Sequence, residues 1–217
     1  EKGRCVMTAT VLPYAFDEGL IQQAKTSIEP VAGIYPFGSK AVVAGRGSDL
    51  DQEVHLDRAQ EDNLPIYRRR GGGCTVFLDP GNLIVSIAFP ADGFGGIQGL
   101  FDKASDWLIK GFQTLGFSGI YQDGISDLVK DDRKIGGSCF YRAKGIAYYS
   151  ASILVAPDLD GMEWYLAHPP REPVYRRGRS HKEFVSGLDL WFPGISVGKL
   201  CRALRMVLEP GSMKQVA

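Results

Sequence analysis

The sequence predicts an α+β protein with a mostly antiparallel β-sheet flanked by helices. Three observations predict this class: β-branched-rich apolar runs joined by short turns, one long amphipathic helix in mid-chain, and an amphipathic helix near the end. Strands joined by turns, without crossover helices, favour antiparallel pairing over a βαβ array. With 217 residues and 44% apolar content, the chain is long enough for one sizeable core, so we expect a single domain over residues 1–217.

Short strands and helices are expected to alternate in the first half of the chain. Helical spacing over residues 16–27 ends before Pro30, since proline cannot continue a helix. The expected elements that follow are strands at 34–37 and 40–44, a charged helix or loop at 49–63, and a strand at 64–67. Two apolar runs at 74–78 and 83–89 flank Asp79-Pro80-Gly81-Asn82, and this turn sequence predicts a hairpin.

The second half begins with a glycine-rich linker at 92–96. Residues 97–115 form the clearest helix, and its apolar stripe is interpreted as core. The remaining expected elements are strands at 120–129, 133–140 and 145–155, a short helix within 157–165, a mobile Arg- and Pro-rich surface loop at 168–181, and an amphipathic helix at 196–208.

Charge and cysteine content exclude several function classes. Lys plus Arg equals Asp plus Glu, at 25 each, so no overall basic field favours nucleic-acid binding. Cys5, Cys74, Cys139 and Cys201 have no CxxC spacing, which disfavours a metal site and a disulfide framework and indicates a reducing, cytoplasmic compartment. No run of 18 apolar residues indicates a membrane span.

Two glycine-flanked basic segments predict an anion site built from distant parts of the chain. Arg68-Arg69-Arg70-Gly71-Gly72-Gly73-Cys74 combines cations with bare backbone N–H donors, and Arg133-Lys134-Ile135-Gly136-Gly137-Ser138 places a second cation beside glycines. The sequence contains neither GxxxxGK[ST] nor GxSxG, which excludes a P-loop and a nucleophile elbow. The three histidines are interpreted as surface residues.

These segments carry a family resemblance. Residues 68–83 resemble the signature of lipoate–protein ligase A, an Arg-rich glycine loop followed by a strand, a glycine-containing turn and a second strand. Ser126-Asp127-Leu128 and residues 132–138 are similar to two further elements of that family, and Ala41-Val42-Val43-Ala44-Gly45-Arg46 resembles its early strand. In order, these motifs cover most of residues 15–190.

The resemblance implies a fold shared with biotin–protein ligases and octanoyltransferases, with an acyl chain in an apolar tunnel. It implies that ATP with Mg²⁺ activates lipoate (or octanoate) to an acyl-AMP, and that a lysine of a lipoyl-domain protein receives the acyl group. Lys134 would then be catalytic, with Arg69 and the backbone of Gly72 and Gly73 around the phosphates. The full set of implied binding residues is Arg68, Arg69, Arg70, Gly71, Gly72, Gly73, Thr75, Asn82, Asp127, Gly136, Gly137 and Ser138.

The chain departs from the family pattern at several positions. The family's loop serine is Gly71 here, its third loop glycine is Cys74, a histidine of the following strand is Leu78, and the histidines after the lysine fall within 148–152, where none is present. The biotin-ligase signature is absent. Because few residues follow the predicted C-terminal helix, we expect no C-terminal accessory domain, and either a separate accessory subunit for adenylation or adenylation by this domain alone.

Two alternatives remain. A transferase of the same fold would carry the acyl group on a cysteine, yet Val185-Ser186-Gly187 and Gly124-Ile125-Ser126, the matching places, contain none. Cys139 follows Lys134 closely but is interpreted as a buried apolar residue. A non-catalytic module that binds lipoate or nucleotide is the second alternative.

Overall fold

The computed structural model describes residues 9–90, 96–143 and 145–216, so most of the linker expected at 92–96 lies outside the described part. Its strands are β1 (Val11–Pro13), β2 (Val31–Pro36), β3 (Ala41–Ala44), β4 (Ile66–Arg68), β5 (Val76–Leu78), β6 (Asn82–Pro90), β7 (Tyr121–Asp123), β8 (Asp127–Lys130), β9 (Arg133–Ala143) and β10 (Ile146–Leu154). Its α-helices are α1 (Glu18–Thr26), α2 (Leu50–Glu53), α3 (Leu56–Glu61), α4 (Ile97–Thr114), α5 (Leu159–Tyr165), α6 (His181–Phe184) and α7 (Val197–Val207). Short 3₁₀ helices are η1 (Val174–Arg176), η2 (Leu188–Leu190) and η3 (Pro210–Val216).

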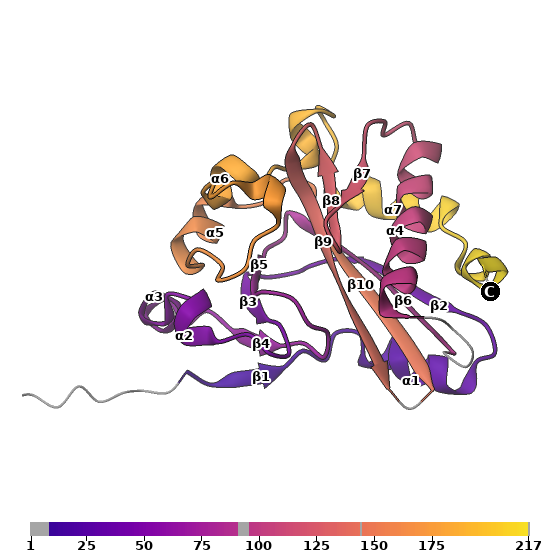
Figure 1. Cartoon of the computed structure of the whole chain (residues 1–217), viewed down its shortest axis with the longest axis horizontal. Helices are drawn as coiled ribbons and strands as arrows, with labels where there is room; N and C mark the ends of the chain where they lie inside the picture. Colours follow the sequence, from indigo (N-terminus) through magenta and orange to yellow (C-terminus); the bar gives the residue numbers. More distant parts are fainter. Residues whose placement is uncertain (1–8, 91–95, 144, 217) are drawn as a thin grey trace, which may run out of the picture.

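The larger sheet is antiparallel throughout, with strand order β2-β6-β10-β9-β8-β7. One face packs against α4 and α7, which lie together on the same side of the sheet in Figure 1. Val85 and Tyr149 of the sheet meet Leu108 and Leu204 of these helices in the main core. The apolar stripe of α4 is therefore core, as its spacing predicts.

The opposite face of the larger sheet packs against α1 and against a smaller sheet of order β1-β4-β3-β5. Ile84 of β6 and Val43 of β3 belong to one apolar cluster, and Ile21 of α1 and Tyr148 of β10 belong to another. Helices α2, α3, α5 and α6 lie around the smaller sheet (Figure 1). The α+β class with helices flanking a mainly antiparallel sheet is confirmed.

The hairpin predicted around Asp79-Pro80-Gly81-Asn82 is wrong. β5 pairs with β3 in the smaller sheet, whereas β6 pairs with β2 and β10 in the larger one. The turn itself forms, because Asp79 N–H donates to Asn82 Oδ1 at 2.8 Å. A Cβ on Gly81 would lie 1.9 Å from the Ala156 carbonyl oxygen, so this position needs glycine. Turn chemistry is local and does not decide which strands pair.

Two other segments also differ from the expectation. The charged stretch at 49–63 forms two short helices, α2 and α3, separated at Val54 and His55. The segment at 168–181 is only partly a surface loop: Tyr175 and Arg176 are buried, at 8% and 4% exposure. Within the described ranges, no helix is long and apolar enough to cross a membrane.

Candidate active site

The glycine loop, residues 69–74, connects β4 to β5, and its own arginine side chain shapes it. Arg69 Nη1 donates to Val43 O at 2.9 Å, and Arg69 Nη2 donates to Gly72 O and Cys74 O at 2.8 Å each. Gly73 adopts φ +90°, which favours glycine. In the structure, backbone carbonyls of the smaller sheet and of the loop accept hydrogen bonds from the Arg69 guanidinium, and its binding of phosphate stays a prediction.

The two neighbouring arginines, Arg68 and Arg70, also have partners within the chain. Arg68 Nη1 donates to Gly45 O at 2.8 Å and to Ser48 O at 3.1 Å, so it fastens the loop after β3. Arg70 pairs with Glu18 of α1 at 2.5 Å. The backbone of Gly72, which is exposed and has open space around its Cα, is the accessible part of the loop. The anion-binding capacity predicted here rests on N–H groups more than on these guanidinium groups.

A close contact brings the glycine loop against the strand that carries Lys134. A Cβ on Gly71 would lie 2.7 Å from Cys139 Sγ, so only glycine lets the loop approach β9 this closely. The distant segments that the sequence predicts as one divided site thus meet in space. Cys139 is buried at 8% exposure, and burial raises the pKa of its thiol, which fits the apolar interpretation.

A β-bulge sets the direction of Lys134. Leu128 pairs with Gly136 and Val129 pairs with Lys134, so Ile135 is the extra residue on β9. Directly paired residues share a face of the sheet, so the bulge puts Lys134 on the same face as Asp127 and its partner Gly137. Without the bulge, strict alternation would turn Lys134 to the other face.

The Lys134 ammonium pairs with Asp127, and the lysine side chain passes over Gly137. Lys134 Nζ lies 2.7 Å from Asp127 Oδ1, and the Tyr175 hydroxyl donates to Asp127 Oδ2 at 3.0 Å. A Cβ on Gly137 would lie 3.0 Å from Lys134 Cε, so the lysine side chain passes directly over this glycine. The Lys134 side chain keeps 27% exposure, which leaves the ammonium accessible to a ligand.

A buried carboxylate lies on the same sheet face. Asp17, at the start of α1, is 4% exposed and accepts hydrogen bonds from Tyr35 (3.0 Å), Ser86 (3.0 Å) and Tyr148 (2.5 Å). Burial, reinforced by the Asp17 charge, raises the pKa values of Tyr35 and Tyr148 above their usual range. Ser150 lies within the stretch where the family's histidines are missing, and its Oγ is 2.9 Å from Ser86 Oγ, which accepts because the single Ser86 proton goes to Asp17.

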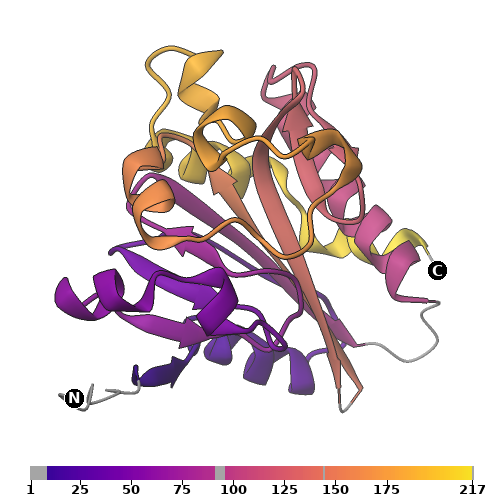
Figure 2. The same cartoon turned by 60° about the vertical axis from the view of Figure 1, so that its left-hand side comes forward.

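The segment after α5 runs over this face of the larger sheet. Figure 2 shows it, in orange, crossing in front of the long strands. Cys74 Sγ donates to Arg171 O at 3.6 Å, and Ser186 N–H donates to Lys134 O at 3.0 Å. Burial, together with the charge of Arg176, lowers the pKa of His181 to about 4. The segment therefore contacts both the glycine loop and the lysine strand.

Three expected binding residues do not belong to this arrangement. Asn82 is fully buried and caps the turn after β5 through Asp79. Ser138 pairs with Ala151, on the face that packs against α4, and its hydroxyl donates to Ser126 O at 3.2 Å. Gly136 also faces that side, since its partner Ile153 belongs to the main core. The contacts that the structure gives these three residues are structural.

Thr75, by contrast, is placed where the loop ends. Its N–H donates to the buried Glu53 carboxylate at 2.5 Å, and its buried hydroxyl has no hydrogen-bond partner among the described residues. The backbone donor, with other hydrogen bonds, lowers the pKa of Glu53 although burial opposes the shift. Neither Glu53 nor Tyr175 was identified from the sequence, because only the tertiary fold brings them to the loop and to Asp127.

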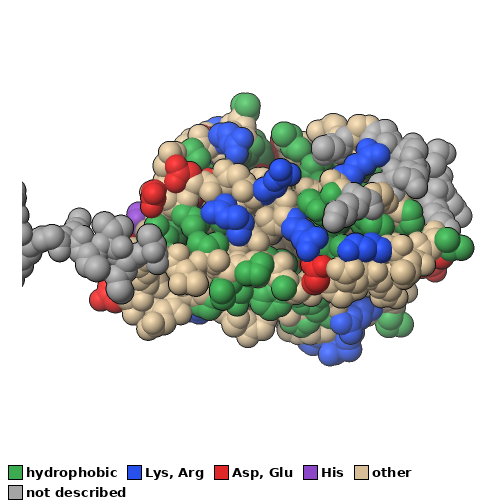
Figure 3. Space-filling view, turned by 90° about the horizontal axis from the view of Figure 1, so that it is seen from below, with side chains coloured by type: hydrophobic (Ala, Val, Ile, Leu, Met, Phe, Trp, Pro, Cys, Tyr) green, Lys and Arg blue, Asp and Glu red, His purple; other side chains and the backbone are tan. Residues whose placement is uncertain are grey.

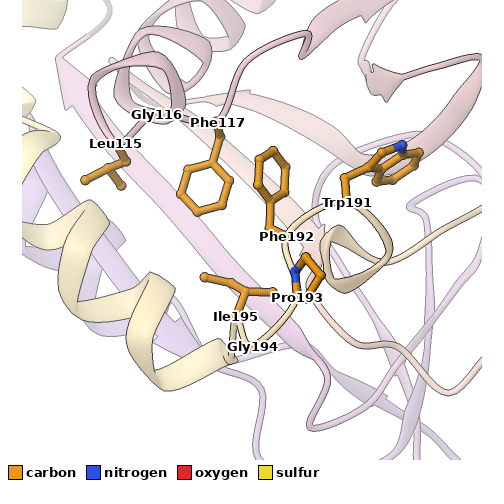
Figure 4. Close-up of a pocket in the computed structure, with 8 residues that line it drawn as sticks. All are labelled: Leu115, Gly116, Phe117, Trp191, Phe192, Pro193, Gly194 and Ile195. Atoms are coloured by element: carbon orange, nitrogen blue, oxygen red, sulfur yellow. The ribbon is translucent and has the colours of Figure 1, made fainter.

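Two features of the molecular surface differ in chemistry: one face carries many basic side chains, and a separate cavity is lined by apolar ones. On the face seen from the side of β1, β4 and α1, Lys and Arg side chains spread across the middle with fewer acidic groups among them (Figure 3). A cavity of about 390 Å³ is instead lined by apolar side chains, among them Phe117 and Phe192, whose rings contact each other edge to face with centroids 4.5 Å apart (Figure 4). None of the described residues that line this cavity is ionisable, so its walls offer no acid, base or anion-binding side chain.

Comparison with known proteins agrees with this geometry. The model of the family described as "Lipoyl protein ligase A/B catalytic domain" matches residues 11–209. The chain belongs to this family. The match covers both glycine segments and the Lys134–Asp127 pair, so the family resemblance of the motifs is confirmed.

Individual relatives are distant. The lipoate-protein ligase A of Blochmanniella pennsylvanica (strain BPEN) is 28% identical over an alignment of 171 residues, which covers 75% of this chain and 48% of that protein. The chain thus spans about half the length of this curated relative. The bi-partite lipoate protein ligase of Thermoplasma acidophilum, described with its E2 lipoyl domain, has a TM-score of 0.73 at 22% identity, covering 91% of this chain and 79% of that one. A lipoate-protein ligase A structure bound with ATP has a TM-score of 0.72 at 22% identity, covering 91% and 83%.

Proposed function

We propose that this chain is the catalytic domain of a lipoate–protein ligase. It would activate lipoate, or octanoate, with ATP and transfer the acyl group to a lysine of a lipoyl-domain protein. The observation that carries the proposal is the Lys134 ammonium, 2.7 Å from Asp127 and on the sheet face that the glycine loop covers. A fixed cation beside free backbone N–H donors suits a reaction in which negative charge grows on a phosphate.

The first step joins the acid to AMP. A carboxylate oxygen of the acid attacks the α-phosphorus, the bond to the β-phosphate oxygen breaks, and pyrophosphate leaves. Charge builds on the α-phosphate oxygens in the transition state, and Lys134 with the N–H groups of the glycine loop would stabilise it. Asp127 and Tyr175 are positioning residues here, because they hold the ammonium without contacting the reacting atoms.

The second step forms the amide. The neutral amine of the acceptor lysine attacks the acyl carbonyl, AMP leaves with the bonding electrons, and the amine loses a proton. Lys134 would stabilise the developing negative charge on the carbonyl oxygen. No covalent acyl-enzyme is needed in either step.

Mg²⁺ would enter as the partner of the ATP phosphates. Mg²⁺ keeps most of its waters and takes only one or two protein carboxylates at such sites. This mode suits the chain, since no group of three or more His, Cys, Asp or Glu within the described ranges could hold a metal ion alone.

Transfer from a thioester through a cysteine is less well supported. Ser186 lies beside Lys134, since its N–H donates to Lys134 O, but its hydroxyl donates to Gly187 O at 3.4 Å and to no base among the described residues. A serine needs an adjacent base to become a nucleophile. Cys139 is buried, with a raised thiol pKa, and is equally unsuited.

Two further observations support the proposed acceptor, a separate accessory subunit and a reducing compartment. The Thermoplasma acidophilum ligase is described as bi-partite and with an E2 lipoyl domain, which supports a lipoyl domain as acceptor and a separate accessory subunit for adenylation. Cys74, Cys139 and Cys201 are free thiols, as expected in a reducing compartment such as the cytoplasm.

Mass spectrometry of a lipoyl domain incubated with the protein separates the alternatives. Acylation with free lipoate, ATP and Mg²⁺ is the expected result. Acylation only from an acyl-carrier thioester would indicate a transferase, and no acylation with intact ligand binding would indicate a non-catalytic module. Pyrophosphate release without any added protein would show that an accessory subunit is unnecessary.

A further inference from the structure

Arg176 is a buried cation with an unused hydrogen-bond donor. The residue is 4% exposed, and its Nη2 has no hydrogen-bond partner among the described residues. Nε donates to Arg179 O at 2.9 Å, and Phe184 lies under the guanidinium at 4.9 Å. A buried charged donor without a partner is costly, so such a group in a folded protein calls for a partner such as an ordered water, an ion or a ligand.

The acid closest to Arg176 only partly compensates its charge. Glu172 Oε2 lies 3.5 Å from Arg176 Nε, beyond a normal hydrogen bond, and the same oxygen lies 2.9 Å from His168. Its other oxygen accepts from Gly178 N–H. Burial lowers the pKa of the Arg176 guanidinium, although the Glu172 charge opposes the shift. The guanidinium thus lies in a place that favours a second negative charge.

Arg176 lies between the parts of the active site. The preceding residue, Tyr175, donates to Asp127, the partner of Lys134. Arg171, earlier on the same segment, contacts Cys74 at the end of the glycine loop. The segment that carries Arg176 therefore contacts both the end of the glycine loop and the acid that holds Lys134.

The arginines of the glycine loop leave this role open. Arg68 and Arg69 donate to backbone carbonyls, and Arg70 pairs with Glu18. Polyphosphate carries several negative charges and is bound best by planar guanidinium groups that offer two donors. Arg176 retains such a donor.

We propose that Arg176 is a further anion-binding residue of this active site, and that its free Nη2 donates to the polyphosphate of ATP. The proposal rests on the proposed ligase function and adds a residue that the glycine-loop motif does not contain. The anion would complete the hydrogen bonding of the guanidinium and replace Glu172 as its main counter-charge. The segment after α5 then contributes to nucleotide binding through one identified atom.

The test uses inorganic pyrophosphate and ATP, each titrated by calorimetry into the full chain. Arg176→Met keeps the apolar stem over Phe184 and removes the charge. The matched control is Arg177→Met, which removes the same charge from an exposed neighbour. We expect Arg176→Met to weaken pyrophosphate binding at least tenfold and Arg177→Met to change it less than twofold. Equal effects in the two variants would overturn the proposal.

A second variant covers the case in which Arg176→Met does not fold. Glu172→Gln removes the competing carboxylate and should tighten pyrophosphate binding two- to threefold, whereas Glu61→Gln, on the exposed surface of α3, should leave it unchanged. Unchanged or weaker binding in Glu172→Gln would also overturn the proposal.

The two proposals can fail separately. If the wild-type protein binds pyrophosphate through Arg176 but acylates no lipoyl domain, the ligase function fails and the role of Arg176 in anion binding stands. If the protein acylates a lipoyl domain and Arg176→Met binds pyrophosphate and ATP as wild type does, the ligase function stands and the role of Arg176 fails.

Discussion

Lys134 Nζ lies 2.7 Å from Asp127 Oδ1, and a β-bulge at Ile135 makes this contact possible. Asp127 begins β8 and Lys134 lies near the start of β9, so the pair joins adjacent strands on one face. Tyr175 occupies the second carboxylate oxygen, which leaves Asp127 little freedom to turn away. The geometry holds the ammonium where the proposed reaction needs it.

Replacing Lys134 by alanine should abolish both adenylate formation and acyl transfer. The loss of one fixed cation at the phosphate and carbonyl should cost at least about 10²-fold in rate. Pyrophosphate release and lipoyl-domain acylation measure the two steps separately. Lys25→Ala, on the exposed surface of α1, is the control and should remain active. A Lys134→Ala rate within threefold of wild type would falsify the assignment.

Alanine at the two adjacent glycines of β9 should give different defects. A Cβ at Gly137 would meet the flexible end of Lys134 at 3.0 Å, so we expect a folded protein with a displaced ammonium and a rate reduced on the order of tenfold. A Cβ at Gly136 would meet the Ser152 carbonyl at 2.9 Å, so the sheet itself must shift, at about 1–3 kcal/mol of stability.

Urea unfolding and single-turnover kinetics distinguish these two defects. Gly137→Ala should keep the unfolding midpoint of wild type and lose rate, whereas Gly136→Ala should lower the midpoint. The reverse pattern would show that Lys134 does not cross Gly137 as described.

Arg69→Ala should weaken binding of ATP and of lipoate together. The sequence alone predicts a selective loss of nucleotide binding, but the guanidinium donates to Val43, Gly72 and Cys74 carbonyls and thereby shapes the whole loop. Loss of these bonds should also reduce the free energy of unfolding by about 2–3 kcal/mol. Calorimetry with each ligand and urea unfolding check both parts. If Arg69→Ala keeps the stability of wild type and loses only ATP binding, the result would instead support a direct contact between Arg69 and phosphate.

His181 should make stability depend on pH below neutrality. Its pKa is lowered from 6.5 to about 4 by burial and by the charges of Arg176 and Lys134, with Glu163 opposing and His168 adding to the shift. The unfolded chain therefore binds a proton before the folded one does, so the contribution is complete above pH 6.5 and is lost as the pH falls toward 4.

Urea unfolding at about pH 7.5 and about pH 5 measures this effect. His181→Gln should reduce the difference in unfolding free energy between the two pH values by about 1–2 kcal/mol. His55→Gln, a half-buried histidine outside the site, is the matched control. An unchanged difference in His181→Gln would show that this histidine titrates normally in the folded protein.

The sequence by itself determined much of the local structure and the family, and it predicted the residues of the site. Periodicity placed α4 within one residue of its observed end, because an amphipathic stripe is encoded locally. Glycine-flanked basic runs identified Lys134 and the glycine loop, since both need residue types that few other settings require. The lipoate–protein ligase A resemblance, which the family match confirms, rests on these same runs.

Only the tertiary structure decided how those groups are used. Pairing of β5 with β3 instead of β6 depends on contacts between residues far apart in the chain, which turn chemistry does not specify. The hydrogen bonds of Arg69 also depend on distant residues, since one acceptor is Val43 of another strand. Tyr175 and Arg176 lie in a segment whose composition predicts an exposed loop, yet the fold buries both. A charged side chain can donate its hydrogen bonds to backbone carbonyls or to a ligand. The packing around it determines which of these acceptors lies within reach.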